Sequence, residues 1–226
     1  MTEREMRGTA ALTAAKWVGI KEGSDDHKAI LTIYNSIRPL PRGYAMGEKD
    51  PWCAAFACAA AQEAGVGGLY PMECSCPKMI ELAKGMGIWQ ERDDHVPKTA
   101  DWVLYDWQDS GSGDNSGSPD HIGIVIGVEG KQMRIVEGNY DNAVKIRRMS
   151  INSKTIRGFI CPDYASIAEP DEPRIYHTLE ELPEWARPTI AKLVKDGSLK
   201  GVAGDDLGLN DDLIRTLVIL DRKGQL

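Results

Sequence analysis

Hydrophobic positions recur with helical spacing through most of the first 84 residues. They predict helices over residues 4–19, 25–34, 53–64 and 77–84. Ser24 is placed to cap the second of these helices. Asp50 and Pro51 suit the N-cap and the first position of the Ala-rich third helix, and Gly65 suits its end. The chain therefore begins with a layer of helices.

The character of the chain changes after residue 100 to the short, largely apolar segments that are typical of strands. The strands expected are 101–107, 121–128, 133–139, 143–149 and 156–162. Because the helices come first and the strands follow, the order of elements predicts an α+β fold with an antiparallel sheet.

The Pro-rich acidic segment ASIAEPDEPR, residues 165–174, interrupts this pattern and is predicted to be a linker. Helical spacing returns in two stretches after it, with a turn at Gly201–Gly204 between them. We therefore expect a first domain over residues 1–164, a linker over 165–174, and a small helical domain over 175–226.

Charge and composition narrow the classes of function. The 226-residue chain has a net charge of -7, and its Lys and Arg residues are not clustered, so we expect no nucleic-acid partner. No run approaches the roughly 20 apolar residues that span a bilayer, and the first residues lack the apolar stretch of a signal peptide. We therefore expect synthesis in the cytoplasm and no stable membrane insertion. Five cysteines, an odd number, predict at least one free thiol.

Cys53 is the cysteine whose position best suits catalysis. It falls in the first turn of the predicted helix 53–64, where unpaired backbone N–H groups and the positive end of the helix dipole lower the pKa of a thiol. The same N–H groups could hydrogen-bond an oxyanion that forms when the thiolate attacks a carbonyl. Position alone leaves a second interpretation open, in which Cys53 is a small buried residue of an Ala-rich helix.

A cysteine nucleophile needs a general base, and His121 is the best placed of the four histidines. It opens an apolar strand, where its alternative role is to cap the strand edge. Glu137 and Asn139 share one face of the next strand, because side chains alternate with period two. That face is also the face of His121 if a three-residue loop, 129–131, or an equivalent bulge joins the strands. An unbulged two-residue turn would separate them.

Four motifs in this order resemble the CHAP family of cysteine, histidine-dependent amidohydrolases and peptidases, within the papain-like superfamily that also holds NlpC-type enzymes. They are DPWCAAF, DWVLYDW, QDSGSGDNSGSPDHIGIV and VEGNY, and the resemblance covers roughly residues 4–164. It implies that Cys53 is the nucleophile, that His121 is the general base, and that Glu137 and Asn139 orient the histidine or polarise the oxyanion. It also implies cleavage of an amide bond in peptidoglycan, without a cofactor.

Aromatic residues give weaker signals. Trp52, beside the nucleophile, and Tyr44 are candidates for lining a substrate cleft, and both could equally be packing residues. Trp89, Trp102 and Trp107 are expected in the core.

Two short patterns could indicate metal binding. Asp106 and Asp114 match two positions of a calcium loop, but Gly117 stands where its bidentate glutamate should be. Cys74 and Cys76 lack the second pair of ligands that a zinc site needs, so we expect structural or incidental thiols there.

The last fifty residues carry the pattern W-A-x-x-x-I-x-x-L-x-x-x-G-x-L-x-G, beginning at Trp185. This pattern resembles modules of the surface-layer-homology type, which associate with cell-wall polymers. The alternative is a helical hairpin that packs against the catalytic domain or mediates dimerisation.

These observations together predict a peptidoglycan hydrolase, a phage or prophage lysin, that acts on the wall after a membrane lesion or from outside. Two alternatives stay open. One is a cysteine amidase or peptidase with a substrate outside the wall, and the other is a catalytically silent wall-binding or phage structural module.

Overall fold

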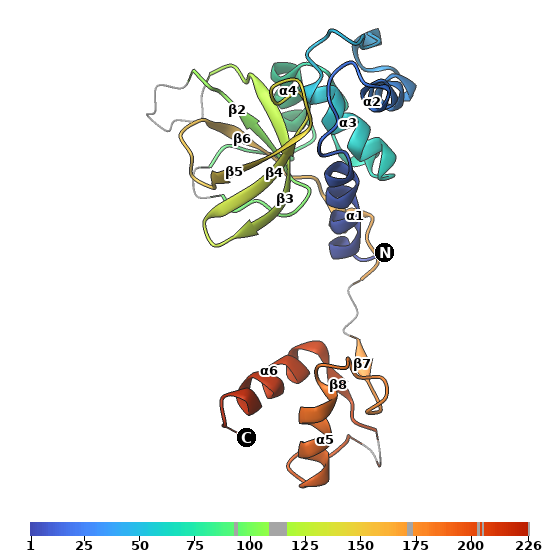
Figure 1. The fold of residues 1–226 in the computed structure, drawn as a ribbon, viewed down its shortest axis with the longest axis vertical. Helices are drawn as coiled ribbons and strands as arrows, with labels where there is room; N and C mark the ends of the chain where they lie inside the picture. The colour runs from blue at the N-terminus through green and yellow to red at the C-terminus, as the bar shows by residue number, and fades with distance from the viewer. Residues whose placement is uncertain (93–94, 109–116, 171–173, 203, 205, 226) are drawn as a thin grey trace. The chain divides into compact units, whose positions relative to one another are not determined.

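The computed structural model describes residues 1–92, 95–108, 117–170, 174–202, 204 and 206–225. The chain divides into two compact units, Met1–Glu169 and Pro170–Leu226, and the boundary lies within the Pro-rich segment 165–174. Figure 1 shows the elements of both units. Within the described residues, none of the helices combines the length and the apolar character needed to cross a membrane.

Four helices open the first unit, as the hydrophobic spacing predicts. They are α1 (Glu3–Lys16), α2 (Asp25–Ser36), α3 (Cys53–Glu63) and α4 (Cys76–Gly85), with short 3₁₀ turns at Pro41–Gly43, Gly67–Leu69 and Tyr164–Ser166. The Ser24 side chain caps α2 by accepting from the His27 N–H. Every residue from Cys53 to Ala61 is buried, because the small alanines of α3 let neighbouring elements approach on all sides.

A six-stranded antiparallel sheet in the order β1-β6-β2-β3-β4-β5 follows the helices. Its strands are β1 (Trp89–Gln90), β2 (Trp102–Tyr105), β3 (His121–Glu129), β4 (Gln132–Glu137), β5 (Lys145–Ser150) and β6 (Ile156–Ile160). Helices α1 and α3 pack against β3, beside the sheet in Figure 1. This arrangement confirms the predicted α+β fold with an antiparallel sheet.

Apolar clusters lie on both faces of the sheet. Residues on one face, among them Leu104, Ile122 and Val136, join the main core with the four helices. Alternate residues, such as Val125 and Ile135, form a second cluster on the other face. His121 and Glu137 belong to this second face by the alternation of side chains along β3 and β4.

The connection between β3 and β4 differs from the predicted three-residue loop. Glu129 pairs with Gln132, so only two residues, 130 and 131, form the turn. A bulge at Ile126 then shifts the register, and Val125 pairs with Ile135. A bulge was the predicted alternative to a three-residue loop. It has the same effect, because it places His121 and Glu137 on one face of the sheet.

The second unit has a hydrophobic core of its own. Its elements are β7 (Ile175–Tyr176), α5 (Arg187–Lys195), β8 (Leu209–Asn210) and α6 (Asp211–Arg222), and β7 pairs with β8. Buried Leu182, Ile190 and Ile214 pack in its centre. The two helices were predicted from their spacing, whereas the two-residue strands are too short to give a recognisable alternation.

Candidate active site

Helix α3 begins at Cys53 with the first turn open at its amino end. Trp52 occupies the N-cap position, and no described side chain caps the helix there. The prediction that Asp50 is the N-cap was wrong, because its carboxylate instead accepts from the Gly47 N–H (2.7 Å) and the Tyr44 hydroxyl (2.9 Å). The first N–H groups of α3 therefore lack a side-chain acceptor and suit an anion.

The Cys53 thiol lies at this open turn and is only 7% exposed. Its pKa is held well below the ordinary value, chiefly by a hydrogen bond from Cys76 at the start of α4. Burial acts in the opposite direction, but a hydrogen bond with His121, the charge of His121 and the Ala54 N–H all lower the pKa of Cys53 further. The structure thus favours the thiolate, which is the nucleophilic form.

His121 starts β3 and connects the thiol to a buried carboxylate. Its Nε2 lies 3.1 Å from Oε2 of Glu137, which is fully buried. Burial alone would lower the pKa of His121, but hydrogen bonds and charges of Cys53 and Glu137 outweigh it and raise the pKa to about 9. The opposite shifts of the two pKa values favour a thiolate on Cys53 beside an imidazolium on His121.

Two residues that the sequence did not single out fix the Glu137 carboxylate. The Tyr105 hydroxyl donates to Oε1 at 2.9 Å. Arg147 of β5 donates from Nε to Oε1 at 2.6 Å and from its terminal nitrogen to Oε2 at 3.0 Å. Burial raises the pKa of Glu137, but the hydrogen bonds from His121 and Arg147 outweigh this effect and keep its pKa below the ordinary value. Glu137 therefore stays charged and orients the imidazolium.

Two glycines make the close approach possible. A Cβ on Gly123 would lie 2.4 Å from Cγ2 of Ile135 and 2.8 Å from Cγ of Glu137. A Cβ on Gly138 would lie 2.4 Å from Cβ of Phe56 in α3. Gly123 therefore gives Glu137 the space to reach His121, and Gly138 lets the end of β4 pack against the helix that carries Cys53.

The remaining predicted site residues are more dispersed. Asn139 is half-buried in the turn after β4, with a left-handed φ of 56°, and within the described residues no hydrogen bond joins its side chain to the other three. Trp52 is fully buried and donates to Glu22 at 3.0 Å, so its ring packs in the core rather than lining a surface. Tyr44 is 49% exposed in the loop before α3.

An exposed aromatic residue does lie beside the histidine, and it is Trp107. We expected Trp107 in the core, but 38% of it is exposed. Its ring stacks on Tyr105 with centroids 4.6 Å apart and lies 6.3 Å from the His121 ring. The Arg147 guanidinium lies 4.9 Å from the same ring. Trp107 is thus a partly exposed aromatic side chain near His121.

The weak calcium candidates do not form a ligand group in the described part of the chain. Asp106 accepts from the backbone of Gln108 at 3.0 Å and belongs to none of the metal-compatible groups among the described residues. Asp114 lies outside the described residues.

Comparisons with known proteins identify the domain. The model of the CHAP domain family matches residues 43–139, a range that runs from Gly43 through Asn139 and holds Cys53, His121 and Glu137. A search of the curated proteins gives no match.

Two solved structures of Ly7917 are similar to this chain. The first has a TM-score of 0.38 and 15% identity, over 78% of this chain and 65% of that chain. The second, of Ly7917 with the hydrolyzing product of MDP, has a TM-score of 0.32 and 16% identity, over 66% of this chain and 64% of that chain. The chain thus spans just under two thirds of the length of each.

The fold and the family match define the class of the first unit. Its helices and six-stranded sheet form an α+β fold of the CHAP type. Residues 43–139 match the family model of the CHAP domain.

Proposed function

We propose that this protein hydrolyses peptidoglycan by cleaving an amide bond of the bacterial cell wall through a thioester on Cys53. The observation that carries the proposal is the pairing of two opposite pKa shifts in one place. The pKa of Cys53 is lowered well below its ordinary value, and that of His121 is raised to about 9. Such a pair supplies a nucleophile and an acid together at neutral pH.

The first half of the reaction forms the thioester. The Cys53 thiolate attacks the carbonyl carbon of the amide, and the carbonyl oxygen takes up the negative charge. The uncapped N–H groups at the start of α3 are placed to stabilise this oxyanion. The His121 imidazolium then gives its proton to the leaving nitrogen, the carbon–nitrogen bond breaks, and the amine departs.

The second half releases the acid. His121, now neutral, accepts a proton from water, and the resulting hydroxide attacks the thioester carbonyl. The carbon–sulfur bond breaks and Cys53 returns as a thiolate. Glu137 stabilises the imidazolium at both stages, because its carboxylate is held in place by Tyr105 and Arg147. This mechanism uses no metal.

Asn139 and Trp107 have proposed roles at the edge of this site. Asn139 follows the orienting Glu137 by two residues, so its amide is a candidate to polarise the oxyanion. The exposed part of Trp107 is proposed to contact the apolar parts of a glycopeptide, in place of Trp52, which is buried.

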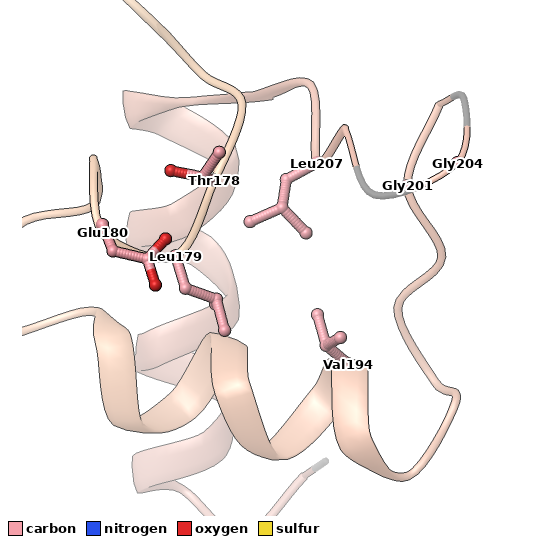
Figure 2. Close-up of a pocket in the computed structure, with 7 residues that line it drawn as sticks. All are labelled: Thr178, Leu179, Glu180, Val194, Gly201, Gly204 and Leu207. Carbon is pink, nitrogen blue, oxygen red and sulfur yellow. The ribbon is translucent and has the colours of Figure 1, made fainter.

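The second unit is proposed to hold the enzyme on the wall. A cavity of about 340 Å³ opens in it, lined by Thr178, Glu180, Gly201 and apolar side chains. Figure 2 shows Leu179 and Val194 pointing into this space. A pocket of mixed polar and apolar lining suits a sugar-containing wall polymer. A wall hydrolase of this kind fits a phage or prophage lysin that reaches its substrate through a membrane lesion or from outside.

Mass spectrometry of fragments released from purified peptidoglycan tests the hydrolase. We expect the wild-type protein and Cys74→Ala, the matched control, to release the same fragments, and Cys53→Ala to release none. New amines at the lactyl junction identify an amidase, and new N-termini within the peptide identify an endopeptidase. If purified walls stay intact after treatment with the wild-type protein, the proposal is refuted, and the remaining hypothesis is a substrate that is not part of the wall.

Sedimentation of the Cys53→Ala protein with insoluble walls tests the second unit. Val194 is 37% exposed and lines the cavity, so Val194→Glu introduces a charge there and should weaken binding by about tenfold or more. Ile219→Glu is the matched control, since Ile219 is exposed but lies outside the cavity lining. Equal binding by both variants would exclude the cavity as the wall-binding site.

A further inference from the structure

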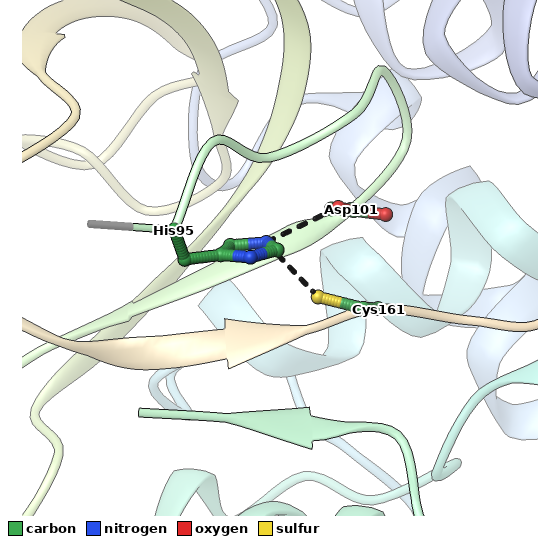
Figure 3. A group of neighbouring side chains, drawn as sticks. All are labelled: His95, Asp101 and Cys161. Carbon is green, nitrogen blue, oxygen red and sulfur yellow. Dashed lines mark hydrogen bonds and ion pairs between the residues drawn. The ribbon is translucent and has the colours of Figure 1, made fainter. Parts of the chain in front are cut away.

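A second group of reactive side chains lies away from the Cys53 site. Asp101 directly precedes β2, and Cys161 directly follows β6. Trp102 pairs with Ile160, so Asp101 and Cys161 are neighbours at one end of these strands. His95 approaches them from the loop before β2, as Figure 3 shows. Tyr105 and the catalytic pair are at the opposite end of β2.

The three side chains converge on one point rather than forming a relay. Nε2 of His95 lies 3.3 Å from Sγ of Cys161 and 3.9 Å from Oδ2 of Asp101. All three atoms lie within 4.8 Å of one another. In a nucleophile–base–acid relay the thiol and the carboxylate would face different ring nitrogens, whereas here both face Nε2. A single nitrogen cannot hydrogen-bond both partners well, but an ion between the three atoms would satisfy them all.

The separations fit a tetrahedral metal ion. Bonds of about 2.0–2.3 Å from zinc to nitrogen, oxygen and sulfur place neighbouring ligand atoms roughly 3.3–3.8 Å apart. The distances from His95 are close to this range, and an ion would draw the three atoms slightly together. The mixture of thiolate, imidazole and carboxylate favours zinc over calcium or magnesium, which prefer oxygen ligands alone.

The surroundings hold the carboxylate ready and allow access. Arg7 donates to Oδ1 of Asp101 at 2.8 Å, and the Lys98 N–H donates to Oδ2 at 2.8 Å, so Oδ2 keeps a lone pair toward His95. Such contacts orient metal ligands in known sites. A cavity of about 290 Å³, lined by all three side chains, adjoins the group and has room for a fourth ligand such as water.

The charges at this cavity also suit a divalent cation. Its lining has three carboxylates, of Glu3, Asp101 and Asp163, against the two cations Arg7 and Lys98.

We propose that His95, Asp101 and Cys161 bind a zinc ion, with the fourth position open to the adjoining cavity. The ion ties the loop before β2 to the end of β6. The site stabilises the fold of the first unit and takes no part in the reaction at Cys53.

Cobalt titration of the metal-free full-length protein, under reducing conditions, tests this site. A thiolate ligand gives Co²⁺ a charge-transfer absorption in the near ultraviolet, and a tetrahedral site gives intense visible bands. We expect both to saturate at one Co²⁺ per chain and to disappear when Zn²⁺ displaces it. The charge-transfer band should be absent in Cys161→Ser, and His95→Ala should bind at least about tenfold more weakly.

Controls separate this site from the other thiols. Cys74→Ser, a half-buried cysteine outside the group, should bind cobalt like the wild type. The double variant Cys53→Ala/Cys76→Ala should also keep the charge-transfer band, because it removes only the active-site thiols. Zn²⁺ should raise the unfolding temperature of the wild type but not that of His95→Ala. A band that survives Cys161→Ser, a band lost in the double variant, or a wild type without any band would overturn the proposal.

Discussion

Gly123 offers the sharpest test of how the fold builds the active site. The residue lies directly beside Glu137, and a methyl group there would meet Ile135 at 2.4 Å and the Glu137 side chain at 2.8 Å. Such separations are shorter than van der Waals contact, so the neighbours must move. Glu137 can move only by giving up its hydrogen bonds to Tyr105, His121 and Arg147.

The expected size of the effect follows from these contacts. Overpacking in a core costs about 1–3 kcal/mol, so Gly123→Ala should lower the unfolding temperature of the unit by about 2 to 12 °C. Loss of a charge-assisted hydrogen bond to His121 costs a further ~1.5–3 kcal/mol at the site, which corresponds to a decrease in kcat/KM of about 10- to 150-fold.

Gly127→Ala is the matched control on the same strand. A Cβ at Gly127 meets nothing within 4 Å, so this variant should keep its activity and change stability by no more than about 0.5 kcal/mol. Thermal unfolding and fragment release from peptidoglycan measure the two effects. If Gly123→Ala retains both full activity and the wild-type unfolding temperature, the assigned position of Glu137 over Gly123 is wrong.

Three further predictions concern the titration of the site. Iodoacetamide near pH 6 should modify Cys53 first, because the pKa of Cys53 is lowered while burial or neighbouring groups raise the pKa of the other four thiols. Peptide mapping measures the order of modification, and another thiol modified as fast as Cys53 would contradict this prediction. Cys76→Ala removes the hydrogen bond that most lowers the pKa of Cys53. For a bond of ~1 kcal/mol, the rate at which iodoacetamide modifies Cys53 should fall about fivefold in Cys76→Ala and stay unchanged in Cys74→Ala. Hydrolysis should decline as the pH rises through about 9, where His121 loses its proton, and Glu137→Gln should move that decline to lower pH. If hydrolysis by Glu137→Gln declines at the same pH as in the wild type, Glu137 does not stabilise the imidazolium of His121.

The local parts of this site were predictable from the sequence. The Ala-rich pattern placed Cys53 in a first helical turn, and the apolar segment that follows His121 placed this histidine at the start of a strand. These inferences succeed because they depend only on neighbours along the chain.

The parts that the sequence did not reveal depend on pairing between strands and on packing. The bulge at Ile126 fixes which residues face His121, yet nothing in the local pattern distinguishes it from a longer loop. Tyr105 and Arg147 reach Glu137 only because their strands flank β3 and β4. The tyrosine at the end of the apolar segment WVLY was a signal that could have been followed, whereas Arg147 stands beside a second arginine in a mostly polar strand and gave no such signal.

Cys76 was missed for a related reason. The sequence offered it only as half of a C-x-C pair, and its contact with Cys53 depends on where α4 begins relative to α3. Asp50 failed as a predicted cap because the nearby loop supplies it with better partners, the Gly47 N–H and the Tyr44 hydroxyl.

Partitioning of the reaction by hydroxylamine tests the central claim most directly, because it detects the thioester on Cys53. In its presence the account predicts that a share of the newly formed ends will be hydroxamates instead of carboxylates, and that this share will rise with hydroxylamine concentration. Cys53→Ala should form neither product. Release of carboxylate ends alone at every hydroxylamine concentration, or continued cleavage by Cys53→Ala, would contradict a mechanism through Cys53.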